Sequence, residues 1–273
     1  MHTRDAFVVR SRFSFDGQLV PILELAGDAV VFRCDIDVKL TLAEGATATL
    51  VENHLGGWNA RFAARSHATV VRSTVEYQRP TAGDDLPWMR CESCDLTVVS
   101  SFIASAPPFE MTAGSHVVLE HSNVIDDFDV PAGAAFRAFG SLFELDDSRP
   151  FFRIAVAPET VDVHLRGNGF LRRLAPLATA FVGRGTESLS PEAFAALPGV
   201  VSVDNRAIDA VPFEASFCVA ATSVARDADV GPFPDASAVG VLDRFGDCRY
   251  SDGRADIGAD ELTVGSACVP PDR

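Results

Sequence analysis

A small residue, usually serine or asparagine, recurs along this chain at intervals close to twenty residues, each time within the same apolar frame. These ladder positions are Ser11, Cys34, Asn53, Ser73, Ser101, Ser122, Ser141, Asn168 and Asn205, and the steps between them are 23, 19, 20, 28, 21, 19, 27 and 37 residues. A repeat of this length is typical of a solenoid, in which each coil packs only on its two neighbours. The period therefore restricts the fold to a stack of similar coils.

The residues around each ladder position predict a short strand. The position two residues later is apolar in all nine repeats, and the position two residues earlier is apolar in seven of them. Because alternate side chains of a strand share one face, we expect the residues two before, at and two after each ladder position to point inward. The positions immediately on either side are largely polar, for example at Asp35, His54, His121 and Asn123, and we expect them to face water.

A single strand of this kind buries too little apolar surface to be stable alone, so the strands must stack. At a strand spacing of about 4.8 Å, a stack of this many coils forms a rod roughly 40 Å long. Serine and asparagine at one inward corner can hydrogen-bond along the stack, which satisfies polar groups that are costly to bury. The sequence thus predicts an all-β fold, a right-handed parallel β-helix of about nine or ten coils.

The domain organisation follows from where the ladder ends. We expect the β-helix over residues 1–211 and an irregular C-terminal cap over residues 212–273, which are rich in Asp, Gly, Pro and Ala and hold three of the six cysteines. Residues 79–94 have the composition of a loop that projects from the rod. The run from Ser190 to Phe194 predicts the start of a short helix with proline at its first position.

Composition limits the partners of this chain. Its 273 residues carry a formal charge of -15, and Lys39 is the only lysine. Such a chain repels phosphate backbones, so we expect no nucleic-acid partner. Neutral glycans or proteins are the favoured ligands, since a polyanionic glycan would need Ca²⁺ as a bridge. No run of eighteen apolar residues is present, so no transmembrane helix is expected, and the sequence does not indicate an oligomeric state.

The cysteines suggest disulfides rather than a metal site. The set is even, which is compatible with an oxidising compartment, and its pairing is open. Cys91 and Cys94 form a CxxC without the second close pair that zinc would need, so a local disulfide is favoured. Cys34 is expected to be a small buried hydrophobe. The acidic run at residues 243–261 lacks the spacing of a calcium-binding EF-hand loop, and ordinary turns are favoured there over Ca²⁺.

The tail carries a family resemblance. Residues 256–261 (DIGADE), preceded by Asp252-Gly253-Arg254, resemble the C-terminal signature of secreted bacterial right-handed parallel β-helix repeat proteins of the pectin-lyase-like superfamily. Residues 223–228 are similar to a segment that often precedes that signature. The resemblance implies export to the cell surface or the medium. No signal peptide is visible and no cap precedes the first coil, so we expect a piece of a longer protein.

The resemblance also indicates where chemistry would lie, because enzymes of this superfamily bind polymers along the outside of one sheet. The corresponding row here is Arg33, Glu52, Arg72, Ser100 and His121. An Arg-Glu-Arg set could clamp a substrate or supply a general base. Charge pairing between neighbouring strands is the favoured interpretation.

A second catalytic candidate is the carboxylate pair Asp126 and Asp127, which could do glycosidase acid/base work. The companion segments of the polygalacturonase-like enzymes are missing, so a turn is favoured. Trp58, Tyr77 and Trp88 are expected outside the strands, where aromatic rings either stack on sugars or pack on the rod. The predicted function is therefore an exported, non-enzymatic binding or structural module, adhesin-like in character. The alternative is a polysaccharide lyase or glycoside hydrolase.

Overall fold

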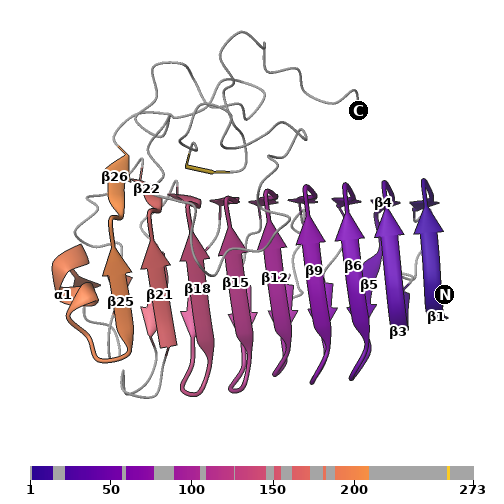
Figure 1. The fold of residues 1–273 in the computed structure, drawn as a ribbon, viewed down its shortest axis with the longest axis horizontal. Helices are drawn as coiled ribbons and strands as arrows, with labels where there is room; N and C mark the ends of the chain where they lie inside the picture. The colour runs from indigo at the N-terminus through magenta and orange to yellow at the C-terminus, as the bar shows by residue number, and fades with distance from the viewer. Residues whose placement is uncertain are drawn as a thin grey trace, which may run out of the picture.

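The chain folds into a rod of stacked coils, a parallel β-helix (Figure 1). The computed structural model describes residues 2–14, 22–56, 60–76, 89–104, 109–125, 127–145, 151–154, 162–172, 181–182, 188–208 and 257–258. Every described strand pair is parallel except β23 (Phe181–Val182) with β24 (Ser188–Leu189). The predicted fold class is confirmed.

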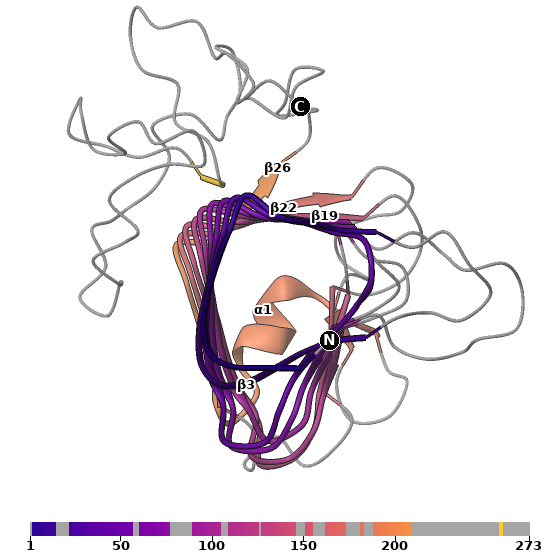
Figure 2. The same ribbon diagram turned by 90° about the vertical axis from the view of Figure 1, so that its right-hand side faces the viewer.

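Each coil contributes strands to three faces, which are visible when the rod is viewed end-on (Figure 2). The long face consists of β1 (His2–Val9), β3 (Ile22–Phe32), β6 (Thr47–Val51), β9 (His67–Val71), β12 (Asp95–Val99), β15 (His116–Glu120), β18 (Ala135–Phe139), β21 (Asp162–Arg166) and β25 (Val200–Val203). The short face consists of β2 (Arg12–Phe13), β4 (Asp35–Ile36), β7 (His54–Leu55), β10 (Thr74–Glu76), β13 (Phe102–Ala104), β16 (Asn123–Ile125), β19 (Leu142–Leu145), β22 (Gly169–Arg172) and β26 (Arg206–Ile208).

The third face consists of β5 (Lys39–Leu42), β8 (Ala60–Phe62), β11 (Met89–Cys91), β14 (Phe109–Met111), β17 (Phe128–Val130), β20 (Phe152–Ile154) and β23. It joins the long face in one 17-stranded sheet, because β3 pairs with β5 along its first half and with β6 along its second. Residues 89–91, expected within a loop, thus form a strand. The reason is that their register places Met89 and Cys91 beside Ala60 and Phe62, where they complete the core.

The ladder predicted from the sequence is a continuous hydrogen-bond chain. The backbone N–H of each ladder residue donates to the side chain of the next ladder residue, over distances of 2.8 to 3.4 Å from Ser11 to Asn205. Hydroxyl groups also donate to the carbonyl two residues earlier, as from Ser73 Oγ to Val71 O at 2.9 Å. One small polar side chain per coil therefore satisfies backbone groups that would otherwise be buried without partners.

A left-handed corner precedes every ladder residue. Its φ lies between 45° and 66° at Arg10, Arg33, Glu52, Arg72, Ser100, His121, Gly140, Gly167 and Asp204. This conformation costs non-glycine residues about 1–2 kcal/mol each, and it turns the chain from the long face to the short face.

The corner overturns one expectation about which side chains point inward. The residues at and two after each ladder position are inward, as predicted, for example Ile36 and Leu55. The residues two before it are not, because strand alternation restarts at the corner. Instead the residues three before it, such as Val31 and Leu50, fill the core. The residues two before it are exposed, as Val203 is at 43%, or are buried outside the core cluster, as Val99 and Phe139 are.

The interior changes in character along the rod. The inward column five residues before the ladder begins with Ala29, Ala48 and Ala68 and continues with larger side chains up to Phe136. Phenylalanines dominate the C-terminal half, where Phe109, Phe128, Phe136, Phe143, Phe151, Phe152 and Phe170 are buried in one cluster. The cross-section is thus filled by small side chains at one end and by aromatic rings further on.

The predicted short helix is present and lies at the end of the rod, beside β25 (Figure 1). Helix α1 (Pro191–Ala195) begins after Ser190, whose Oγ accepts from the Ala193 N–H at 3.2 Å. Its Phe194 is buried, with its ring centroid 6.1 Å from that of Phe152. The helix therefore extends the aromatic core at the last coil.

The short face is covered in its later coils, which corrects the expectation that His121 and Asn123 face water. Both are buried, at 1% and 2% exposure. The outward neighbours of Asn123 on the adjoining strands, Phe102 and Leu142, are apolar, and Ile257 packs on this face, so polar residues of these coils are buried as well. Of the expected cap over residues 212–273, only residues 257 and 258 lie within the described part of the chain.

Candidate functional site

The Arg-Glu-Arg row lies on the corner between the long and short faces. Because Arg33, Glu52 and Arg72 occupy the corner position of consecutive coils, their side chains project next to one another. Arg33 Nε donates to Glu52 Oε2 at 2.5 Å, and Arg72 Nη2 donates to Glu52 Oε1 at 2.8 Å. Glu52 thus bridges the arginines of both neighbouring coils, which is charge pairing between adjacent strands.

The pairing fixes the ionisation of Glu52. Partial burial raises the pKa of this carboxyl, but the hydrogen bonds and positive charges of Arg33 and Arg72 outweigh it and hold the pKa below its ordinary value of 4.5. Both carboxylate oxygens also accept from guanidinium groups. A carboxylate in this state is a weak base and a poor proton donor at neutral pH, so the geometry suits structural pairing or ligand contact better than proton transfer.

We expect the contribution of Glu52 to stability to depend on pH. A lowered pKa means that the stabilisation is present above the unfolded value near 4.5 and is lost as the pH falls through the folded value. At pH 7, Glu52→Gln should lower the free energy of unfolding by at most about 1 kcal/mol, because the pair is partly exposed. Urea unfolding of both proteins between pH 7 and pH 3 should show this difference shrinking, and a constant difference would contradict the assignment.

The exposed part of the predicted row is shorter than expected. Ser100 and His121 continue the corner column, but both are almost completely buried. Exposed corner side chains are therefore interrupted in the middle coils and return at Asp204 in the last coil.

A second set of ion pairs lies beside the corner, on the exposed half of the short face. Arg12 Nε is 3.3 Å from Asp35 Oδ2, and His54 Nδ1 is 3.0 Å from Asp35 Oδ1. His54 Nε2 is 3.8 Å from Glu76 Oε2, so the ring lies between carboxylates of two other coils. His54 is exposed, as predicted. We call this surface, made by Arg12, Arg33, Asp35, Glu52, His54, Arg72 and Glu76, the corner patch.

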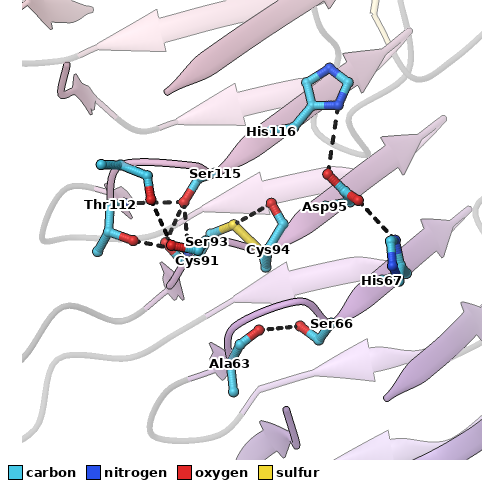
Figure 3. Close-up of a disulfide and its surroundings, with 11 residues drawn as sticks. Ala63, Ser66, His67, Cys91, Ser93, Cys94, Asp95, Thr112, Ser115 and His116 are labelled. Carbon is cyan, nitrogen blue, oxygen red and sulfur yellow. Dashed lines mark hydrogen bonds and ion pairs between the residues drawn. A yellow bond between two sulfur atoms is a disulfide. The ribbon is translucent and has the colours of Figure 1, made fainter. Parts of the chain in front are cut away.

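The sequence reasoning missed a histidine pair on the long face (Figure 3). His67 Nδ1 is 2.9 Å from Asp95 Oδ2, and His116 Nδ1 is 3.8 Å from Asp95 Oδ1. Each of these residues stands six positions before a ladder residue, so counting back across the corner would have found them. No group of three or more ligating side chains in the described part of the chain could hold a metal ion.

The other candidates are resolved only in part. Asp127 is described and is 3% exposed, and its backbone carbonyl accepts from the Phe109 N–H at 3.0 Å. Its predicted companion Asp126 lies outside the described residues, as do the aromatic candidates Trp58, Tyr77 and Trp88.

The CxxC is oxidised. Cys91 and Cys94 form a disulfide, with Ser93 between them in the left-handed region (Figure 3). Cys34 is free and buried, as predicted, and its Sγ accepts from the Ser11 N–H. The remaining three cysteines lie outside the described residues.

The described outer surface of the first coils is thus a set of charged pairs on a stacked scaffold. None of the described helices has the length and apolar character needed to cross a membrane. Comparison with known proteins identifies no relative, since no family model, no curated protein and no solved structure matches the chain.

Proposed function

We propose that this chain is an exported, non-enzymatic binding or structural module, an adhesin-like rod. The observation that carries the proposal is the state of the corner patch: its ionisable groups are engaged with one another. Glu52 is ionised and held by two arginines, and His54 lies between two carboxylates. Groups committed in this way present fixed donors and acceptors rather than a reactive nucleophile, acid or base.

The scaffold supports a binding role. The ladder and the strand pairing hold successive coils at the spacing of neighbouring strands, about 4.8 Å, so side chains on the corner project as an ordered row. Guanidinium and carboxylate groups alternate along that row, and the imidazole of His54 lies beside it on the short face. Such a surface can hydrogen-bond to the hydroxyl groups of a neutral glycan or to the polar groups of a protein without net charge attraction.

Two further observations support export. The Cys91–Cys94 disulfide is compatible with an oxidising compartment. The DIGADE tail resembles that of secreted β-helix repeat proteins, and its Ile257 and Gly258 pack against the rod. Membership of the pectin-lyase-like superfamily is part of this proposal and rests on the resemblance of the tail.

The proposal is tested by screening the full chain for binding and cleavage on a panel of neutral and acidic glycans, with and without Ca²⁺. We expect binding without cleavage, weakened about tenfold or more by the double variant Arg33→Gln/Arg72→Gln. The matched control is Arg153→Gln on the third face, where the arginine also pairs with a carboxylate, Asp129, at 2.9 Å. The control should bind as the wild type does.

The enzyme alternative gives a different result in the same screen. Reproducible cleavage of a glycan that is lost in Asp127→Asn, with circular dichroism unchanged, would overturn the proposal in favour of a lyase or hydrolase. Binding that is indifferent to the corner patch would refute its role as the contact surface.

A further inference from the structure

Ile257 and Gly258 occupy a defined position on the outside of the short face, although they are remote in sequence from the strands they contact. Ile257 is fully buried in a cluster with Leu142, Leu171 and Ile208, which belong to β19, β22 and β26. The Gly258 N–H donates to the Gly140 carbonyl at 2.7 Å. One apolar pocket and one backbone hydrogen bond therefore hold two consecutive residues.

The position of Gly258 admits only glycine. Its φ is 115°, a conformation that side chains rarely adopt. A Cβ atom at this position would lie 2.3 Å from Asn123 Oδ1. Asn123 is itself 2% exposed and therefore has little room to move away. The site excludes larger residues through both the backbone and the neighbouring side chain.

The contacted face differs in composition from the rest of the short face. The outward position one residue after the ladder is occupied by Arg12, Asp35 and His54 in early coils. In later coils the same position holds Phe102, Asn123, Leu142 and Gly169, which are all buried, and the outward position two residues further on holds Leu171 and Ile208, at 3% and 2% exposure. A strand face exposed to water has no need for apolar outward residues, whereas a face that binds an apolar segment requires them.

We propose that the outer face of β16, β19, β22 and β26 is a peptide-binding site for an apolar residue followed by glycine, filled by the chain's own Ile257-Gly258. Leu142, Leu171 and Ile208 select the apolar side chain. The Gly140 carbonyl selects the next backbone N–H, and Asn123 requires that residue to be glycine. This inference is independent of what the corner patch binds.

The test empties the site in the full chain and offers the ligand in trans. Ile257→Asp places a carboxylate in the apolar pocket, which should displace the segment. A fluorescent peptide of residues 254–261 should then bind this variant at least tenfold more tightly than it binds the wild type, whose site is occupied. A peptide with the Gly258→Ala change should not bind. Val201→Asp, at a residue 46% exposed on the long face, is the control and should gain no peptide binding.

Hydrogen exchange in the wild type gives an independent measurement if the variant does not fold. The Gly258 amide should exchange at least a hundredfold more slowly than in the free peptide, because it donates to Gly140. Exchange at the free-peptide rate would overturn the inference. Equal binding of the two peptides, or equal binding of the peptide by wild type and folded Ile257→Asp, would also overturn it.

Discussion

Phe152→Ala should lower the free energy of unfolding by about 3–5 kcal/mol, the range for truncating a buried aromatic residue. Phe152 has no exposed surface, and its ring lies 5.1 to 6.3 Å from those of five other phenylalanines. The cavity would open where rings from three coils and from α1 meet. Equilibrium urea unfolding followed by circular dichroism measures the change.

The control for this substitution is Phe7→Ala, in a side chain that is 73% exposed. It removes the same atoms without leaving a cavity, so we expect a change within about 0.5 kcal/mol. Similar losses in both variants would show that the aromatic cluster does not carry the stability assigned to it.

Asn168→Ala should cost about 2–6 kcal/mol through lost hydrogen bonds rather than lost volume. Asn168 is completely buried; its Oδ1 accepts from the Ser141 N–H and its Nδ2 donates to the Ala138 carbonyl, both at 2.9 Å. Alanine removes the partner of the Ser141 N–H and of the Ala138 carbonyl, and each buried group that loses its hydrogen bond costs about 1–3 kcal/mol. Urea unfolding again provides the measurement.

Asn168→Ser is the matched comparison, because serine occupies the equivalent position in other coils. Ser141 Oγ, for instance, accepts from the Ser122 N–H at 3.1 Å. A serine at position 168 can restore the acceptor for Ser141, so we expect less than half of the loss seen with alanine. If serine and alanine destabilise equally, the ladder bond is not the source of the effect.

The ladder could be predicted because one small residue per coil, usually serine or asparagine, accepts the same backbone hydrogen bond in every coil. The inward column before it was wrongly assigned for an equally local reason. The corner is left-handed at Glu52 and Arg72, which are not residue types that signal this conformation, and glycine marks the corner only at Gly140 and Gly167.

The candidate site, too, could be predicted from the sequence only in part. The pairing of Glu52 with Arg33 and Arg72 follows from the ladder offset alone, since equal offsets become neighbours in a stack. The burial of His121 could not be predicted from this offset, because strand alternation tells which side of a strand a residue occupies but not what covers that side. The covering contact of Ile257 joins segments far apart in the chain. Its only advance signal was the apolar character of outward residues such as Leu142.

The change from small to aromatic side chains along the interior has a consequence for how this chain finds its register. Ladder residues are so alike that a stack threaded one coil out of step would keep most of its hydrogen bonds. Such a slip would set a bulky ring like Phe136 against space shaped for a smaller neighbour, and it would leave voids elsewhere. Both errors cost free energy in a packed interior. The gradient of side-chain size in the core therefore distinguishes one coil from the next and specifies the register, which the repeated backbone hydrogen bonds do not.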